Sequence, residues 1–268
     1  MKDVSDYICI FASKTDILIK EYAMVPVHQE GNVFSQQLCI PCYQTDQKGL
    51  LKPTAFMDMA QEIAYWAAEA LGFGYDNLHV HHTAWVLARM HICFLRPVHW
   101  RDSVTLYTWH KGASGLLYLR DFLLRDTNGE TAVAATTSWV VMDELTRRLV
   151  RPEDLKQLLQ VEQTDHAIAE PAPKVALSNE MELVGDHIVT HAEIDINAHT
   201  NNAKYVAWAI DALPIDVAAS PIKELCINFI KETIQGDCVQ LYRFHSSDTW
   251  LVEGRVEDKS CFAVWFKF

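Results

Sequence analysis

Residues 90–110, MHICFLRPVHWRDSVTLYTWH, decide the fold because the same pattern occurs again at residues 225–245, LCINFIKETIQGDCVQLYRFH. The two stretches align without a gap at an offset of 135, and seven of their 21 positions are identical. Chance similarity between two amphipathic strand pairs is the alternative. An ungapped match of this length favours duplication of one structural unit, so the sequence predicts two related halves.

Each half is predicted to contain a helix followed by strands. In the first half, residues 52–71 carry apolar side chains at helical spacing, with Thr54 as the expected N-cap and Gly72 as the stop. The strands expected after it lie at residues 85–95, 103–110, 116–124 and 131–142. The second half is expected to hold a helix at 202–212 and strands at 222–231, 238–244, 249–256 and 261–268. This order is typical of an α+β fold in which an antiparallel sheet wraps around a helix.

The domain boundary is predicted at residues 156–174, a linker with Pro171 and Pro173 and no clear periodicity. It separates an N-terminal domain at 25–155 from a C-terminal domain at 175–268. Residues 1–24 match nothing in the repeat, so they are either a flexible extension or precede a true start at Met24.

Composition excludes several classes of protein. The 268 residues include 35 acidic and 23 basic ones, a net charge of -12, which disfavours nucleic acid and anionic membrane surfaces as partners. No apolar run is long enough to span a membrane. The seven cysteines are odd in number and scattered, which indicates reduced thiols and a cytoplasmic protein. His79, His81 and His82 lack a nearby acidic or cysteine partner in sequence, so we expect no metal and no cofactor.

The densest polar cluster is HAEIDINAHTNNAKY, residues 191–205. Asp195, Asn197 and His199 alternate, so in an extended chain they would point the same way, just before the start of a helix. An acid, an amide and an imidazole beside free helix N–H groups suit acyl transfer. The alternative is a polar turn with Asn201 and Asn202 as helix caps.

The repeat helps to separate these alternatives. Aligning Asp46 with Asp195 places Asn197 opposite Lys48 and His199 opposite Leu50. In the repeated strand segment, Glu232 falls opposite Pro97. Polar groups that lack a counterpart in the other copy indicate function, so we expect the second half to carry the chemistry and the first to hold the substrate.

The motifs also resemble a known family. The segment from Asp195 to Tyr205 resembles the signature of hot-dog thioesterases, an Asp, an Asn and a His followed by Asn-Asn-x-x-Tyr. The first half is similar to the N-terminal domain of plant and bacterial acyl-ACP (acyl carrier protein) thioesterases at residues 85–90, 120–126 and 138–149. The resemblance covers about residues 33–245.

This resemblance implies a tandem, or double, hot-dog fold and hydrolysis of the fatty acyl-ACP thioester to free fatty acid and ACP. It assigns catalysis to Asp195, Asn197, His199 and Glu232. The plant enzymes commonly have Cys after that Glu, where this chain has Thr233, so a thiolate mechanism is excluded there. We therefore hypothesise direct hydrolysis, in which Glu232 and Asp195 activate a water, Asn197 and helix N–H groups hold the thioester oxygen, and His199 completes the network.

Substrate contacts are expected in the first half. The resemblance implies that the first-half helix and sheet line the acyl tunnel, with Met57, Ala60, Ala64, Met90 and Ile92 as candidates and ordinary core packing as the alternative. Candidates for docking the acidic ACP are Arg147, Arg148 and Arg151, with solvated surface arginines as the alternative. The protein is expected to be a monomer or homodimer. The rival functions are an acyl-CoA thioesterase and a non-catalytic acyl-binding protein of the same fold.

Overall fold

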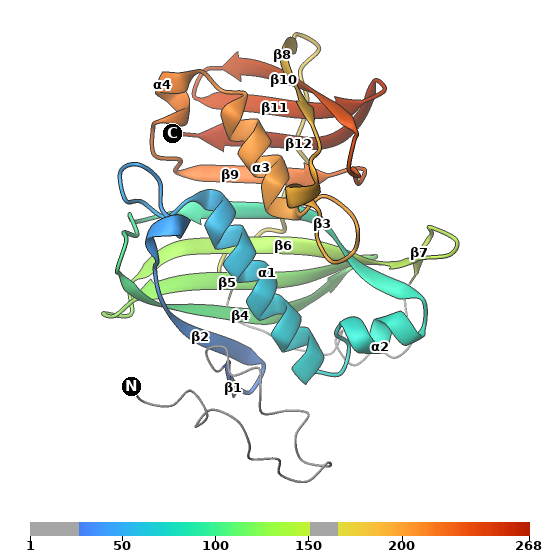
Figure 1. Ribbon diagram of the computed structural model, residues 1–268. Coiled ribbons are helices and arrows are strands. Elements are labelled where there is room, and N and C mark those ends of the chain that lie inside the picture. Colours follow the sequence, from blue (N-terminus) through green and yellow to red (C-terminus); the bar gives the residue numbers. More distant parts are fainter. Residues whose placement is uncertain (1–26, 151–165) are drawn as a thin grey trace, which may run out of the picture.

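The computed structural model describes residues 27–150 and 166–268, in which twelve strands form one antiparallel sheet (Figure 1). The first half supplies β1 to β7, at His28–Glu30, Val33–Cys39, Thr83–Phe94, Ser103–Ser114, Leu117–Asp126, Thr131–Asp143 and Leu149–Val150. The second half supplies β8 to β12, at Glu182–Ile188, Glu224–Phe229, Cys238–Ser246, Thr249–Val256 and Lys259–Lys267. The helices are α1 (Pro53–Ala70), α2 (Tyr75–Val80), α3 (Asn202–Asp211) and α4 (Ile215–Ala218), and the short 3₁₀ turns are η2 (Cys42–Gln44) and η4 (His191–Glu193).

The strand order shows the duplication directly. From one edge to the other it is β1-β2-β4-β5-β6-β3-β9-β12-β11-β10-β8, with β7 paired to β6 off this path, so the two halves join through β3 and β9. At that seam Met90 pairs with Ile227 and Ile92 pairs with Leu225. The offset of 135 maps Met90 onto Leu225 and Ile92 onto Ile227, so the halves are related by a pseudo-two-fold axis between β3 and β9. The predicted α+β fold is confirmed: in each half antiparallel strands wrap a helix, and the two halves form one continuous sheet.

Both long helices lie on the same face of the sheet, one over each half (Figure 1). Phe56 and Ile63 of α1 and Val206 of α3 are fully buried, and they belong to one core cluster with strand residues of both halves. Burial of one such side chain stabilises the fold by about 1.5–3 kcal/mol. The apolar spacing therefore fixes which face of each helix meets the sheet.

The start of the first helix differs from the prediction. The helix begins at Pro53, with Lys52 rather than Thr54 as the N-cap residue. Proline suits the first helical position because it lacks an N–H that would have no partner there and because its φ is already helical.

The strands β2 and β8 were not predicted. They are the strands that precede each helix, and they pair with β4 and β10. Most residues of β8 are exposed, and β2 has glutamines at positions 36 and 37. Their alternation is weak, so neighbouring strands rather than local pattern place them.

The described end of the linker packs on the outer face of the sheet. The Ala167 N–H donates to Asp121 at 2.8 Å, and the Val175 N–H donates to Asn228 at 2.8 Å. Burial raises the pKa of Asp121, and the ammonium of Lys111 lies 3.4 Å away. The expected extension at 1–24 and the linker residues 156–165 lie outside the described residues.

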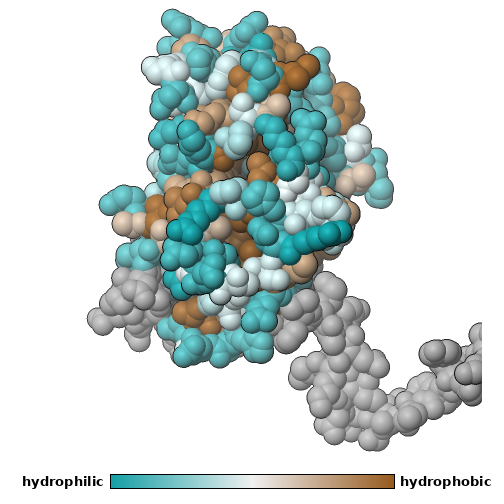
Figure 2. Space-filling model, turned by 90° about the vertical axis from the view of Figure 1, so that its left-hand side faces the viewer, coloured by the Kyte–Doolittle hydropathy of each residue, from teal (hydrophilic) through white to brown (hydrophobic). Residues whose placement is uncertain are grey.

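The surface is mixed in character. On the side shown in Figure 2, hydrophilic residues predominate and hydrophobic residues occur in small groups between them. Within the described chain, the helices are too short or too polar to cross a membrane.

Candidate functional site

The polar segment 195–199 forms a tight turn and not the extended chain that its alternation suggested. The Asp195 N–H donates to the His199 carbonyl at 2.8 Å, and the Ala198 N–H donates to the Asp195 carbonyl at 3.1 Å. The Asp195 carboxylate accepts the Asn197 N–H at 2.8 Å. Aspartate side chains commonly close turns in this way, which explains why the extended prediction was wrong.

Glu232 lies just beyond the end of β9, on backbone that is held on both sides. The N–H groups of Ile230 and Lys231 donate to the Cys261 carbonyl at 2.8 and 3.0 Å. On the other side, the Thr233 N–H donates to the Tyr205 hydroxyl at 3.0 Å. The chain leaves the sheet after Phe229, earlier than predicted, and this exit directs Glu232 toward the turn at 195–199.

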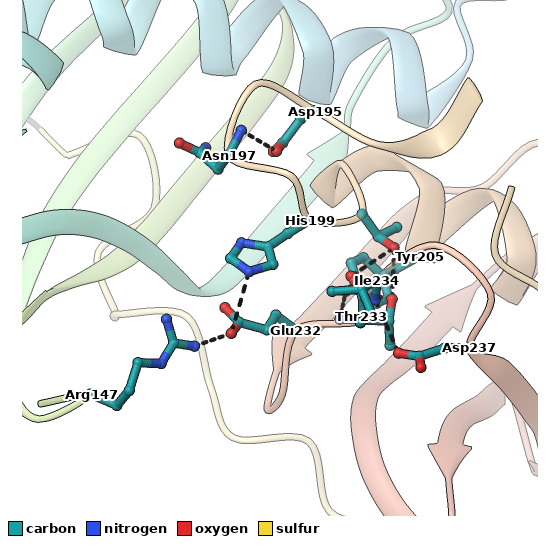
Figure 3. A network of polar contacts seen from close by, with 10 residues as sticks. Arg147, Asp195, Asn197, His199, Tyr205, Glu232, Thr233, Ile234 and Asp237 are labelled. Carbon is teal, nitrogen blue, oxygen red and sulfur yellow. Dashed lines mark hydrogen bonds and ion pairs between the residues drawn. The ribbon is translucent and has the colours of Figure 1, made fainter. Parts of the chain in front are cut away.

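His199 and Glu232 come together, as the family resemblance implied (Figure 3). The distance from His199 Nε2 to Glu232 Oε1 is 3.4 Å, and each side chain is about one third exposed. The guanidinium of Arg147 contacts the same carboxylate oxygen. An imidazole and a carboxylate at this separation can share or relay a proton.

Asp195 and Asn197 lie to one side of this pair, on the same turn as His199 (Figure 3). Both line the same cavity as His199 and Glu232. The structure therefore brings all four predicted catalytic residues to one cavity. In this arrangement the Asp195 carboxylate also holds the turn.

The first turn of α3 is satisfied mostly by its own cap. The Ala203 N–H donates to the Asn201 side chain at 2.9 Å, and the Lys204 N–H donates to the Asn201 carbonyl at 2.9 Å. Asn201 is thus the helix N-cap, as the alternative reading held. These two N–H groups are not available to a substrate oxygen, which corrects that part of the sequence hypothesis.

Thr233 stands behind the site and not in it. Its side chain is fully buried, and its hydroxyl lies 2.7 Å from that of Thr200 and 3.0 Å from that of Tyr205. Thr233 is not among the residues that line the cavity. A hydroxyl committed in this way is not placed to act as a nucleophile.

A cavity of about 880 Å³ opens beside these residues and runs over the first half. Its apolar walls come from the C-terminal part of α1, from α2 and from strands β3, β5 and β6, and include Ala64, Ala68, Phe73, Leu78, Trp85, Leu87, Tyr118, Leu119, Trp139 and Met142. Polar residues also line it, among them Gln61, His110 and Arg120.

Of the five residues expected to contact the acyl chain, Ala64 lines this cavity. Met57, Ala60, Met90 and Ile92 are instead buried in the main core between helix and sheet. The sequence pattern predicted the buried face of α1. It did not show that the cavity lies beside an adjacent row of helix residues. Gln61 and Ala68 in that row were missed.

One wall of the cavity carries a buried cation. Arg120 is 8% exposed, and burial lowers the pKa of its guanidinium to about 10. Its guanidinium donates to the Thr108 hydroxyl at 3.2 Å. The cavity is therefore not uniformly apolar.

The three arginines expected to dock ACP have different positions. Arg147 lines the cavity and contacts Glu232, with its side chain 50% exposed, and Arg148 is also exposed to solvent. Arg151 lies outside the described residues. Arg147 is therefore engaged by Glu232, and of the two described arginines we consider Arg148 for a surface role.

A second group of possible ligands lies on the outer face of the seam. The ligand atoms of His91, Cys93 and Glu224 all lie within 4.8 Å of one another. Lys267 pairs with Glu224 at 3.0 Å, and burial raises the pKa of the Cys93 thiol to about 11, with a further increase from Glu224. We therefore interpret this group as an ion-pair network across β3, β9 and β12. The sequence had directed attention to His79, His81 and His82 instead.

The fold and the site together define a double hot-dog protein whose second half bears an acid–imidazole pair. Two protein-family models match: "Acyl-ACP thioesterase N-terminal domain" over residues 31–157 and "Acyl-ACP thioesterase C-terminal domain" over residues 178–258. The chain belongs to the acyl-ACP thioesterase family.

Curated relatives carry names from the same family. The chloroplastic palmitoyl-acyl carrier protein thioesterase of Arabidopsis thaliana is 27% identical over 237 residues, covering 82% of this chain and 57% of the relative. The chloroplastic oleoyl-acyl carrier protein thioesterase 1 of Arabidopsis thaliana is 25% identical over 230 residues, covering 79% of this chain and 63% of the relative. The chain thus spans less than two thirds of the length of these relatives.

Solved structures show the same fold. An acyl-ACP thioesterase from Bacteroides thetaiotaomicron superimposes with a TM-score of 0.80 at 21% identity, covering 88% of this chain and 98% of that one. The 12:0-ACP thioesterase from Umbellularia californica gives a TM-score of 0.80 at 22% identity, covering 90% and 98%.

Proposed function

We propose that this protein hydrolyses fatty acyl-ACP to free fatty acid and ACP. The observation that carries the proposal is the pairing of His199 with Glu232 at 3.4 Å, beside a large and mostly apolar cavity. An apolar cavity suits an acyl chain, and the acid–imidazole pair suits activation of water at its thioester. The family supplies the substrate class.

In the proposed reaction, Glu232 accepts a proton from a water whose oxygen attacks the thioester carbonyl carbon. A carbon–oxygen bond forms, the carbon–sulfur bond breaks, and the carrier's thiol leaves with a proton passed through Glu232 and His199. The side-chain amide of Asn197 donates a hydrogen bond to the thioester carbonyl oxygen as negative charge develops there. The Asp195 carboxylate orders this turn through the Asn197 N–H, and in the proposed reaction it assists Glu232 in activating the water.

Product analysis tests the proposal. Purified protein is incubated with acyl-ACPs of several chain lengths, and the free acids are identified by mass spectrometry. We expect release of free acid by the wild type and a loss of about 10²-fold or more in kcat for Glu232→Gln, which keeps the shape but not the base. Equal turnover by the wild type and Glu232→Gln would contradict the mechanism. Faster turnover of acyl-CoA than of acyl-ACP would identify the rival acyl-CoA thioesterase, and acyl binding without turnover would identify a binding protein.

Docking of ACP is proposed at the exposed Arg148, beside the cavity-lining Arg147. Both the chain and ACP are acidic overall, so docking needs a local basic group. Arg148→Glu should raise the KM for acyl-ACP and leave the KM for a small acyl thioester in place. An unchanged KM for acyl-ACP would contradict docking at this residue.

A cytoplasmic location is also part of the proposal, with a monomer or homodimer as the working form. It is supported by the cysteines of the described residues, all six of which are free thiols. Fractionation of cells that express the full chain tests the location, and light scattering measures the oligomeric state.

A further inference from the structure

We propose that Arg147, supplied by the first half, is a positioning residue that holds the Glu232 carboxylate against His199. The inference rests on the proposed thioester hydrolysis, and it changes the role that the sequence suggested for Arg147, which was docking of ACP. It also places part of the reaction centre in the half that was expected only to hold substrate.

Glu232 needs such a partner because its backbone is fixed but its side chain is long and about one third exposed. Among the described residues, its carboxylate has Arg147 and His199 as ion-pair partners. His199 is charged only when protonated, whereas a guanidinium keeps its charge and offers donors in a fixed plane. Arg147 is therefore the partner that can hold the carboxylate whatever the state of the imidazole.

The turn that carries Arg147 is itself held firmly. The Asp143 carboxylate accepts the N–H groups of Leu145 and Thr146 at 3.1 and 2.6 Å, and the Thr146 hydroxyl at 2.8 Å. These bonds, with the Thr146 N–H as the largest contributor, lower the pKa of Asp143. Arg147 has a φ of +58°, in the left-handed region that non-glycine residues seldom occupy.

Strand pairing brings the turn that carries Arg147 close to Glu232. Strand β6 pairs with β3, which pairs in turn with β9 of the second half, and Glu232 follows β9. The β6–β7 turn therefore lies close enough for an arginine to reach across the seam. The two halves are joined at the reaction centre as well as through the sheet.

The experiment uses a thioester of N-acetylcysteamine as substrate, because a small substrate without a carrier removes any effect on docking. We expect Arg147→Gln to lower kcat by about 10²-fold with little change in KM, since misplacing a reacting group by about 1 Å can have that effect. Arg147→Lys should recover part of the loss, and guanidinium ions should partly rescue Arg147→Ala. Asp143→Ala, which loosens the turn but keeps Arg147, should lower kcat in the same direction by less. Arg96→Gln, which removes an arginine from the surface pair with Glu130, is the matched control and should behave as the wild type.

A readout that needs no turnover completes the test. The ring nitrogen resonances of His199 should shift in Arg147→Gln because the carboxylate has moved, and they should not shift in Arg96→Gln. Unchanged or raised kcat in Arg147→Gln would overturn the inference, and raised kcat would identify an inhibitory contact instead. If the wild type hydrolyses no thioester, the proposed function fails, and unshifted His199 resonances would then overturn the positioning role separately.

Discussion

The turns at residues 46–50 and 195–199 occupy equivalent places, each between a 3₁₀ turn and a long helix. The Asp46 N–H donates to the Leu50 carbonyl at 2.8 Å, and the Asp195 N–H donates to the His199 carbonyl at 2.8 Å. Each aspartate also accepts an N–H two residues later, at 2.7 Å in the first turn and 2.8 Å in the second. The backbone is thus shared, and the difference lies in the side chains that it presents. The comparison separates the backbone and aspartate hydrogen bonds that form the turn from the side chains that can take part in a reaction.

The residues packed behind the two turns also differ between the halves. In the first half the Leu51 N–H donates to the Val98 carbonyl at 2.8 Å, and in the second the Thr200 N–H donates to the Thr233 carbonyl at 2.9 Å. The apolar side chains of Leu51, Val98 and Phe56 correspond to the hydroxyls of Thr200, Thr233 and Tyr205. Where the first half has side chains that pack, the second half has a hydrogen-bonded group that fixes the backbone next to Glu232.

The largest effect is expected from substitutions at equivalent positions of the two turns. His199→Ala should lower kcat by about 10²–10⁴-fold, the range typical of general acid–base groups. Leu50→Ala should leave kcat at the wild-type value, because Leu50 has the same backbone role without the imidazole. Steady-state kinetics on an acyl thioester measures both variants. Similar losses in the two would mean that the turns are not functionally distinct.

A second pair of variants separates the structural and chemical roles of the aspartates. Asp195→Asn keeps the oxygen that accepts the Asn197 N–H but removes the charge, so we expect near wild-type stability and a kcat about 10²-fold lower. Asp46→Asn should change neither. Urea unfolding and kinetics measure the two properties. Full activity in Asp195→Asn would restrict Asp195 to its role in the turn.

A third comparison concerns Glu193, which corresponds to Gln44 at the end of the preceding 3₁₀ turn. Desolvation alone would raise the pKa of Glu193, but donors from Thr190, His187 and Trp208 outweigh it and lower the pKa to about 2. A carboxyl whose pKa is depressed on folding stabilises the protein above its unfolded pKa and loses that contribution as the pH falls toward the folded value. The stabilising contribution should therefore fade between about pH 4.5 and pH 2.

Glu193→Gln converts this position to the residue of the first half. We expect it to lower the free energy of unfolding by on the order of 1–3 kcal/mol at pH 6, with a difference from the wild type that shrinks toward pH 2. Urea unfolding at several pH values measures this. A difference that stays constant with pH would mean that ionisation of Glu193 does not stabilise the fold.

The smallest effect is expected from exchanging the residues that adopt positive φ. Gly49 has a φ of +74°, and its counterpart Ala198 has a φ of +61°. Gly49→Ala should lower, and Ala198→Gly should raise, the free energy of unfolding by about 1 kcal/mol, the usual strain of a side chain in this region. Thermal unfolding checks both signs. If both substitutions changed the free energy of unfolding in the same direction, backbone strain at positive φ would not explain the effects.

Much of the fold and part of the site followed from the sequence alone. The repeat, the two helices and most strands were predicted because apolar periodicity and an ungapped internal match are local signals. The comparison of the two copies also singled out His199 and Glu232, and these residues meet in the structure. A duplicated unit makes differences between its copies visible before any coordinates are known.

Other features were decided by tertiary structure. The contact between Arg147 and Glu232 joins residues 85 positions apart in the chain, and it depends on how β3 pairs with β9 across the seam. The packing of α1 on the sheet is also tertiary. It determines that Gln61 and Trp85 line the cavity while Met57 and Met90 are buried in the core. The weakly patterned strands β2 and β8 are placed by their neighbours. A local pattern shows which side chains avoid water, but strand register and helix packing decide which of them meet each other and which face a cavity.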